Sequence, residues 1–504
     1  MSPPMTPTSR RSFLGGAAGA GVVASAWPAM AAPSPGGAIA PRARALLPGS
    51  RVAAFENGRE LDAARLEVEG AFPADLKGVF HRNGPAMFER GDVRYRHWFD
   101  GDGFVQRWRI ENGGVRYRSR FIQTSKFRTE AAAGAFLFPV SGGGVAASPS
   151  AAFSGADSAN PSNTSIVAVG AESWALWEGG SAMRIDPESL DTLGLVRLGG
   201  EIDGAPFSAH PRRGEDGRMW NIGSLGQRVL LYRLDAAGAL ESFKVQPLGQ
   251  EGYVHDFLLT ARSLVVVQCS TETRGPRSLE SGTFGTIRGV PDKPMRVHVF
   301  DRETFDLVRQ AELPSGFAFH FGNAWEEGNG TIHFDVVHYV DGDQMLEFFK
   351  PLSGQFPTWQ GVSHRVTLPP AGAPRFERMH ARAEFPKINP RFDARRHRYV
   401  YATGFEERDR EDWFDAVIKI DLDEGRNGVF SYGPDWMVEE HVFVPRPGGI
   451  REDDGWVVGT ALNWARGQTA LTVFDAARPD VGPLARAWLD QAMPLGLHGD
   501  FRSS

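Results

Sequence analysis

Short hydrophobic segments that alternate with polar turns recur along most of the chain. Residues 184–194 and 299–308 are close copies of one another, and looser copies lie at residues 232–240, 420–425 and 473–481. In each copy an aspartate stands at a turn between two apolar segments, as is typical of a β-hairpin. Repeats of this kind at intervals of tens of residues predict a β-propeller, whose blades are small antiparallel sheets around a central axis. The repeats account for about five blades, and filling the remaining length at the same spacing predicts seven.

Helical periodicity is scarce in this pattern. Residues 130–142 and a segment near residues 346–349 are the candidates for short helices. Residues 141–159 are low in complexity and predict a loop, either one that gates a site or plain disorder. We therefore expect an all-β protein, a seven-bladed β-propeller with short helices and loops capping the active-site face. Residues 49–504 are expected to form this single domain.

Composition narrows the class of protein. The chain has 504 residues, with 41% hydrophobic and 23% charged residues, which is ordinary for a globular protein. Its net charge of -6 and the lack of basic runs argue against nucleic-acid binding. Cys269 is the only cysteine, so no disulfide can form within the chain.

The first 31 residues are typical of an export signal. Ser9, Arg10, Arg11, Ser12, Phe13 and Leu14 precede a weakly apolar run that ends at a small-residue cleavage site, Ala29-Met30-Ala31. This arrangement resembles a twin-arginine signal and predicts export of the folded protein by the twin-arginine machinery into the bacterial periplasm or beyond. The alternative is a disordered N-terminus with a chance Arg-Arg pair. Residues 32–48 follow as a linker, and no later segment is long and apolar enough to span a membrane.

Four histidines occupy unusual positions. His320 lies in G-F-A-F-H-F-G-N-A-W, and the others are His210 in F-S-A-H-P, His255 in G-Y-V-H-D-F and His498 in L-H-G-D-F. An imidazole buried among phenylalanines is unfavourable unless a partner binds it. If each histidine lies near the inner strand of a different blade, all four converge on the propeller axis and can hold one metal ion. Nitrogen ligands suit iron, copper, zinc or nickel, and the sequence does not select among these metals.

Carboxylates next to large apolar residues are candidates to hold the outer nitrogen of these imidazoles. They are Glu178 in A-L-W-E-G-G, Glu384 in A-E-F-P-K-I-N and Glu440 in V-E-E-H-V-F. Two alternatives stay open at this point. Each histidine could be an ordinary core residue, as we expect for His81, His97, His298, His333, His338, His364, His380, His397 and His441. His498-Gly499-Asp500 also has the form of a two-histidine, one-carboxylate iron site.

Nine ordered motifs connect the chain with a known family. They are F-H-R-N-G-P (80–85), H-W-F-D-G-D-G (97–103), A-L-W-E-G-G (175–180), A-H-P (209–211), H-D-F (255–257), F-H-F-G-N-A-W-E (319–326), E-F-P-K-I-N (384–389), E-D-D-G (452–455) and L-H-G-D-F (497–501). From about residue 78 onward the chain resembles the carotenoid cleavage oxygenases, which include apocarotenoid and lignostilbene dioxygenases. The resemblance implies a seven-bladed propeller with non-haem Fe(2+) bound by His210, His255, His320 and His498. It also implies outer glutamates at 178, 384 and 440, and a threonine, Thr164, whose methyl group blocks one open metal position.

The same resemblance implies the reaction. Dioxygen is added across a carbon–carbon double bond of a carotenoid or apocarotenoid, which yields two carbonyl products. In the stilbene-cleaving members a lysine and a tyrosine bind the phenol of the substrate, and Lys126 and Tyr95 resemble them, so a hydroxystilbene or phenylpropenoid is the alternative substrate. Lys126 could instead pair with Glu130. Residues 346–359 carry aromatics that could line a tunnel, contact a membrane or pack as an insertion. A more distant alternative is a non-catalytic propeller that acts as a binding platform.

Overall fold

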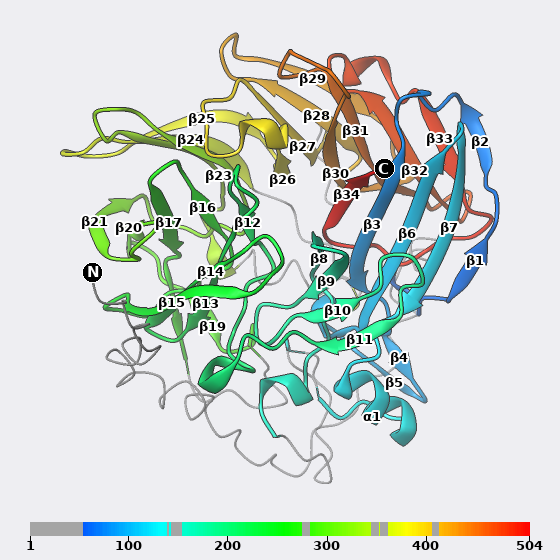
Figure 1. Ribbon diagram of the computed structural model, residues 1–504, viewed down its shortest axis with the longest axis horizontal. Coiled ribbons are helices and arrows are strands. Elements are labelled where there is room, and N and C mark those ends of the chain that lie inside the picture. Colours follow the sequence, from blue (N-terminus) through cyan, green and yellow to red (C-terminus); the bar gives the residue numbers. More distant parts are fainter. Residues whose placement is uncertain are drawn as a thin grey trace, which may run out of the picture.

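A ring of antiparallel sheets around a central axis dominates the computed structural model (Figure 1). The structure describes residues 54–138, 141–142, 154–274, 283–343, 352, 361–405 and 413–504. Seven of its sheets have four or five strands and form the blades, so the predicted seven-bladed propeller is confirmed. The expected export signal (1–31), the linker (32–48), the helix near 346–349 and almost all of the 346–359 segment lie outside the described residues.

We number the blades in chain order and list the strands of each from the axis outward. Blade 1 contains β34 (Gly499–Ser503), β3 (Gly78–Pro85), β6 (Gly103–Glu111), β7 (Gly114–Phe121) and β1 (Leu61–Ala63). Blade 2 contains β8 (Ser165–Val169), β9 (Glu172–Leu176), β10 (Met183–Ile185) and β11 (Thr192–Leu195). Blade 3 contains β12 (Arg212–Arg213), β13 (Met219–Leu225), β14 (Arg228–Leu234) and β15 (Leu240–Pro247).

The second half of the ring follows the same plan. Blade 4 contains β16 (Phe257–Leu259), β17 (Ser263–Gln268), β20 (Met295–Asp301) and β21 (Leu307–Leu313). Blade 5 contains β22 (Phe321–Glu326), β23 (Ile332–His338), β24 (Val362–Leu368) and β25 (Arg375–Ala381). Blade 6 contains β26 (Ala383–Lys387), β27 (Tyr399–Gly404), β28 (Ala416–Asp421) and β29 (Arg426–Ser431). Blade 7 contains β30 (Trp436–Pro445), β31 (Gly455–Asn463), β32 (Gln468–Asp475), β33 (Ala485–Trp488) and β2 (Glu67–Gly70).

The two ends of the described chain close the ring by exchanging strands. The C-terminal β34 pairs with β3 in blade 1, where Phe501 lies opposite Phe80. The N-terminal β2 pairs with β33 in blade 7, where Val68 lies opposite Ala487. Blades 1 and 7 are each completed by a strand from the opposite end of the chain, so the ring has no open seam between them.

The repeats found in the sequence mark one element of the blade. All five lie at the connection between the third and fourth strands of a blade, counted from the axis, and their aspartates are Asp186, Asp235, Asp301, Asp421 and Asp475. The carboxylate of Asp186, for example, accepts hydrogen bonds from the backbone N–H groups of Glu188 and Ser189. Asp301 binds the N–H groups of Glu303 and Thr304 in the same way. A short acidic side chain at these positions therefore satisfies the turn backbone and allows the strand to reverse.

The hydrophobic core lies between neighbouring blades. The second strand of blade 4, β17, reads Ser-Leu-Val-Val-Val-Gln and is buried at every position, because sheets pack against both of its faces. The outermost strand β21 alternates between exposed and more buried positions. Continuous apolar runs therefore identify inner strands, and alternating patterns identify the rim.

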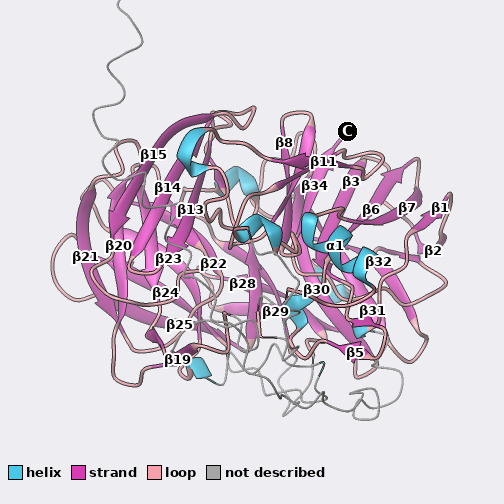
Figure 2. Ribbon diagram, turned by 90° about the horizontal axis from the view of Figure 1, so that it is seen from below, coloured by secondary structure: helices cyan, strands magenta, loops and turns pink. Residues whose placement is uncertain are grey.

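The helix predicted at residues 130–142 begins and ends earlier. The one α-helix in the described residues is α1 (Ser125–Ala133), which is preceded by Thr124, whose hydroxyl accepts a hydrogen bond from the Phe127 N–H. Gly134 ends it in the left-handed conformation with φ of 64°. Figure 2 shows how short the helical segments are beside the strands. No helix in the described ranges combines the length and apolar character needed to cross a membrane.

The remaining described elements are short. Five 3-10 helices lie at Trp98–Asp100, Ala156–Ser158, Gly200–Ile202, Pro390–Phe392 and Pro479–Val481. Two small hairpins pair β4 (Glu89–Arg90) with β5 (Val93–Arg94) and β18 (Thr271–Thr273) with β19 (Ile287–Gly289). Part of the low-complexity segment at residues 141–159 is described, as the 3-10 turn at Ala156–Ser158, and residues 143–153 lie outside the described part.

Candidate metal centre

The four histidines lie just before the innermost strands of four different blades. His210 precedes β12, His255 precedes β16, His320 precedes β22 and His498 precedes β34. Because the innermost strands surround the axis, residues at their starts converge there although they are remote in the sequence. The placement is the one that the sequence predicted.

The imidazoles meet closely at the axis. The Nε2 atoms of His210 and His255 are 2.9 Å apart. The ring centroid of His210 lies 5.2 Å from that of His320 and 4.6 Å from that of His498. His320 and His498 are 4.9 Å apart by the same measure. Potential ligand atoms of His210, His255 and His320 all lie within 4.8 Å of one another.

The other three blades also contribute to this point. Thr164 directly precedes β8 of blade 2, Glu384 lies in β26 of blade 6, and Glu440 lies in β30 of blade 7. The innermost strand of every blade therefore carries or adjoins one predicted site residue. The eighth, Glu178, comes from the turn after β9.

Three of the four imidazoles have a carboxylate on their Nδ1 side. The Nδ1 atom of His255 lies 2.6 Å from Glu178, that of His320 lies 2.5 Å from Glu384, and that of His498 lies 2.8 Å from Glu440. A carboxylate there fixes the proton on Nδ1 and leaves Nε2 free to accept a metal. Asp500, which would complete a two-histidine, one-carboxylate site, accepts a hydrogen bond from the Ala168 N–H instead.

Irregular strand geometry aims two of these carboxylates. The register of β26 against β27 shifts between Glu384 and Lys387, and the register of β30 against β31 shifts between Val438 and His441. Bulges of this kind redirect side chains out of the regular alternation of a strand. Phe385, next to Glu384, has a φ of 54°, which is unusual for a residue with a side chain. This strained backbone conformation lies at the candidate metal centre, where the surrounding residues hold Phe385 in place.

Further donors hold the carboxylates from behind, and the sequence did not predict them. The hydroxyl of Tyr253 donates to Glu178 at 2.8 Å, and the hydroxyl of Tyr339 donates to Glu384 at 2.8 Å. Glu440 accepts from the ammonium of Lys387 at 2.9 Å, and the Arg82 guanidinium lies 3.6 Å away. Tyr253 could have been found, because it lies two residues before His255 and a period of two places both on one face.

Burial and neighbouring charge set the protonation states of the site. Burial lowers the pKa of His498 to about 4, and burial together with the adjacent imidazoles holds the pKa of His210 well below its usual value. Burial raises the pKa of Glu440, but Lys387 and His498 outweigh burial and the pKa is lowered overall. Neutral imidazoles beside ionised carboxylates are the forms that bind a divalent metal.

The donor set fits a single metal ion. The Nε2 atom of His320 is buried and has no hydrogen-bonding partner among the described residues. Two nitrogens bound to one metal at about 2.1 Å and at right angles are about 3 Å apart, close to the spacing of the His210 and His255 Nε2 atoms. One ion at the axis would satisfy all of these nitrogens at once.

A cavity of about 100 Å³, which we call the aromatic cavity, lies on one side of the centre. Its lining includes His255 and Thr164 together with the aromatic side chains of Phe99, Trp177, Tyr253 and Phe284. The carbonyl of Thr164 accepts a hydrogen bond from the backbone N–H of His498, so Thr164 is tied directly to a histidine of the centre. Loops on this face supply most of the lining, which makes it the capped side of the axis.

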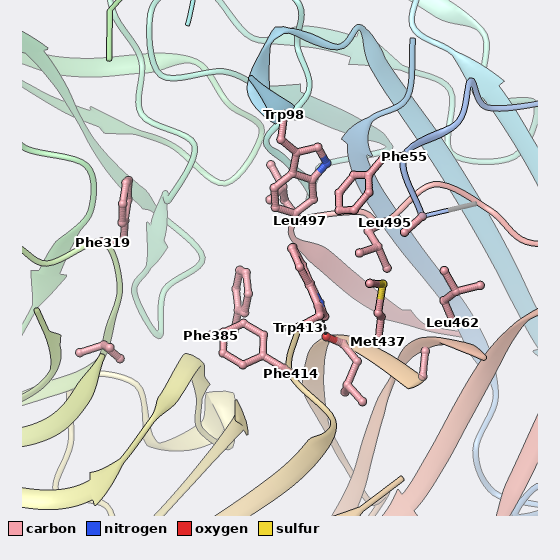
Figure 3. Packing of buried hydrophobic residues seen from close by; sticks show 14 of the residues in the cluster. Phe55, Trp98, Phe319, Phe385, Trp413, Phe414, Met437, Leu462, Leu495 and Leu497 are labelled. Atoms are coloured by element: carbon pink, nitrogen blue, oxygen red, sulfur yellow. Dashed lines mark hydrogen bonds between the residues drawn. The ribbon is translucent and has the colours of Figure 1, made fainter. Parts of the chain in front are cut away.

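Aromatic side chains continue outward from the imidazoles. The ring centroid of Phe385 lies 5.1 Å from that of His320 and 5.3 Å from that of His498. Figure 3 shows Phe385 beside Phe414 and Trp413, with Trp98 packed against Phe55 in the same cluster. On the other side Phe319 packs edge-on against His255 at 4.8 Å. Aromatic rings therefore pack against the imidazoles from two sides.

A second cavity, of about 300 Å³, follows the innermost strands away from the centre, and we call it the axial cavity. His210, His320 and His498 line its inner end. Residues that follow these histidines in the chain, including Arg213 and Asp500, line it farther out, together with residues of β8, β26 and β30. The centre therefore separates two cavities of different character.

The structure places Lys126 and Tyr95 in a buried charge cluster beside α1. The Lys126 ammonium lies 2.8 Å from Asp102 and 2.9 Å from Glu130, so the predicted alternative, an ion pair with Glu130, is formed. The hydroxyl of Tyr95 donates to Glu130 at 3.4 Å. Burial lowers the pKa of Lys126, but the two carboxylates outweigh it and keep the ammonium charged. Neither Lys126 nor Tyr95 is among the described residues that line the aromatic cavity.

Histidines predicted to be core residues have ordinary partners. His81 contacts the Pro187 carbonyl at 3.0 Å, His397 contacts Asp335 at 2.6 Å and His441 contacts Thr472 at 2.9 Å. All three are buried. The side chain of His380 lies outside the described part of the structure.

Comparisons with known proteins agree with this architecture. The family model described as retinal pigment epithelial membrane protein matches residues 54–503. Apocarotenoid-15,15'-oxygenase from Synechocystis sp. is 31% identical over 459 residues, which cover 86% of this chain and 92% of the relative. Lignostilbene-alpha,beta-dioxygenase isozyme III from Sphingomonas paucimobilis is 27% identical over 485 residues, which cover 88% of this chain and 94% of the relative. The crystal structure of the cobalt-substituted Synechocystis enzyme superimposes with a TM-score of 0.79 at 29% identity and covers 90% of this chain and 98% of its own.

Proposed function

The chain belongs to the carotenoid cleavage oxygenase family, which the retinal pigment epithelial membrane protein model describes, and on that premise we propose that it is a non-haem Fe(2+) dioxygenase. Its reaction would add the two atoms of dioxygen across a carbon–carbon double bond of a carotenoid or apocarotenoid and release two carbonyl products. The observation that carries the proposal is the convergence of His210, His255, His320 and His498, three of them backed by glutamates.

Each residue of the centre has a defined task in this proposal. Bound by the four imidazoles, ferrous iron would supply redox chemistry and the activation of dioxygen. Glu178, Glu384 and Glu440 orient three imidazoles and hold a proton on Nδ1, so that Nε2 faces the axis as a neutral ligand. Cleavage of an alkene by dioxygen to two carbonyls requires no transfer of a proton to the substrate, so these carboxylates serve to orient the imidazoles.

The aromatic cavity is the proposed position of the reacting double bond. It touches the centre through His255 and Thr164, and its aromatic rings offer an apolar surface to a conjugated chain. These rings exclude water and orient the alkene, while the methyl group of Thr164 narrows the access to one side of the centre. An apolar surrounding also favours a hydrophobic substrate over a charged one.

Carotenoid-type substrates are favoured over hydroxystilbenes by the state of Lys126. A phenol-binding lysine needs an ammonium directed into the substrate cavity, but Lys126 is buried between two carboxylates. The relative with a lignostilbene substrate is also less similar than the apocarotenoid oxygenase, at 27% against 31% identity. The hydroxystilbene or phenylpropenoid alternative is kept because Lys126 and Tyr95 are present at matching positions.

The test is to prepare the protein without metal, load it with Fe(2+) under argon, and supply polyenes, apocarotenals and hydroxystilbenes under labelled dioxygen. We expect one bound iron per chain and two labelled carbonyl products from an apocarotenal, identified by mass spectrometry. Efficient cleavage of hydroxystilbenes alone would shift the substrate assignment. A protein that retains no iron and consumes no oxygen with any alkene would instead be a propeller that serves as a binding platform.

Export is a separate part of the proposal, supported by the Arg10-Arg11 motif and the cleavage site near residue 31. We propose that the folded protein reaches the periplasm or the exterior through the twin-arginine machinery. Replacing both arginines with lysine should leave the protein in the cytoplasm, as measured by cell fractionation. Contact of residues 346–359 with a membrane stays a prediction, which vesicle co-sedimentation of the purified protein can test.

A further inference from the structure

The axial cavity connects the four-histidine centre with the surface on the side away from the aromatic cavity. At its inner end it is lined by His498, which is 5% exposed, and at its outer end by Arg213 and Ser503, which are exposed. Its walls follow β12, β22, β26 and β34, which start at the centre, and the part of β30 from Glu440 onward. At about 300 Å³ it is the roomier of the two cavities that touch the histidines.

Charged side chains line this cavity, and the acidic ones outnumber the basic ones. Four carboxylates, Asp256, Asp393, Asp500 and Glu440, face three cations, Arg212, Arg213 and Lys387. Most of these charges are engaged, since Asp256 is paired with Arg212 at 2.8 Å and Glu440 with Lys387 at 2.9 Å. The net charge of the lining is therefore negative.

Asp393 is the carboxylate without such a partner. Asp500 accepts from the Ala168 N–H, but no donor in the described part of the chain lies within hydrogen-bonding distance of the Asp393 carboxylate. Burial raises the pKa of Asp393 to about 6, so it is charged at neutral pH. A carboxylate in this state attracts cations into the cavity.

The complete four-histidine site forms only when the ring closes. The four histidines come from blades 1, 3, 4 and 5, so the site exists only once those blades are assembled. A hydrated divalent cation pays a large desolvation penalty in an apolar passage. The aromatic cavity is smaller, and its one carboxylate, Glu178, is already bound by Tyr253 and His255.

We propose that the axial cavity is the route by which the divalent metal ion reaches the folded apoprotein, with Asp393 as the carboxylate that draws the ion inward. The inference rests on the proposed four-histidine centre. Arg213, whose guanidinium binds the Ala168 carbonyl at the outer end, opposes entry through its positive charge. Metal loading and substrate binding then use opposite sides of the centre.

The experiment measures the rate at which the apoprotein takes up Co(II), a metal that has been substituted into the Synechocystis relative. Apoprotein prepared with a chelator is mixed with Co(II) in a stopped-flow instrument, and the visible absorption of bound cobalt is followed. Asp393→Asn should slow association about three- to tenfold at low salt, and Arg213→Gln should accelerate it by a similar factor. Both differences should shrink at high salt, because the steering charge is screened.

Asp306→Asn is the matched control, since it changes net charge equally at an exposed outer turn where Asp306 pairs with Lys244. It should take up Co(II) at the wild-type rate, and thermal unfolding of every variant verifies folding. Wild-type rates in both Asp393→Asn and Arg213→Gln would overturn the route, as would an equal slowing in the Asp306 control. If wild-type apoprotein binds no Co(II), the four-histidine centre itself is wrong, and the inference falls with it.

Discussion

Replacing Tyr339 with phenylalanine removes one buried hydrogen bond behind the centre and keeps the ring. The Tyr339 hydroxyl donates to one oxygen of Glu384 at 2.8 Å, and the other oxygen contacts His320 at 2.5 Å. The Glu384 side chain is 1% exposed, so water has little access to take the place of the hydroxyl. Without the donor, Glu384 must take up a proton or rotate, and both changes weaken its hold on His320.

The size of the effect follows from the cost of an unsatisfied buried acceptor. That cost is about 1–3 kcal/mol, and about 1.4 kcal/mol corresponds to a tenfold change in affinity. Complete loss of the carboxylate that binds the Nδ1 side of a metal-bound histidine costs about 10- to 100-fold in metal affinity. We therefore expect Tyr339→Phe to weaken Co(II) or Fe(2+) binding roughly tenfold.

Tyr253→Phe is the internal comparison, because Tyr253 donates to Glu178 at the same distance of 2.8 Å. Glu178 is 24% exposed, so water can replace the lost hydroxyl, and the loss should stay below about threefold. Metal affinity is measured by titration against a competing chelator under argon. A loss in Tyr253→Phe equal to or greater than that in Tyr339→Phe would refute the argument from burial.

Three further predictions test the centre and its surroundings. His255→Ala should abolish metal retention and activity while circular dichroism stays unchanged, and the control His333→Ala should retain metal; normal turnover without His255 contradicts the ligand assignment. Burial lowers the pKa of His81 to about 4 and of His441 to about 3, whereas the unfolded chain binds protons below about 6.5. The free energy of unfolding should therefore fall steadily as pH drops from about 6.5 to 4, by on the order of 3 kcal/mol for each histidine. The thermal midpoint measured across this range should fall with it, and a flat profile would contradict this. Lys126→Met should destabilise the protein by roughly 3 kcal/mol in thermal or denaturant unfolding and impair all substrates alike, because Asp102 and Glu130 lose one of their two cations and keep Arg90. A selective loss of hydroxystilbene cleavage would instead support phenol binding.

Local patterns in the sequence were sufficient to predict the blades of the propeller. The hairpin aspartates, such as Asp186 and Asp301, interact with backbone groups two or three residues away, so their role is visible in a short stretch. The α-helix was misplaced because its start depends on one hydroxyl, that of Thr124, and its end on the left-handed Gly134. Both are local signals, and they place the helix five residues earlier than the predicted start at residue 130.

The residues of the candidate site likewise include some that the sequence predicted and some that it did not. The four histidines stood out because an imidazole is costly in an apolar segment, and the family motifs assigned their partners. Tyr339 and Lys387 did not stand out, since a tyrosine or a lysine in a strand is ordinary until the carboxylate that it contacts is known. Those carboxylates lie 45 and 53 residues away in the chain, Glu384 from Tyr339 and Glu440 from Lys387.

The sequence by itself determined the class of fold and singled out the four histidines, because turn chemistry and the cost of burying an imidazole act within a few residues. Only the tertiary structure decided how those residues are held. The register shifts at Glu384 and Glu440 depend on strand pairing within blades 6 and 7. The donors behind these carboxylates and the charges along the axial cavity depend on contacts between different blades. Such contacts arise only when the ring closes, since each side chain is then oriented by strands that are distant in the chain.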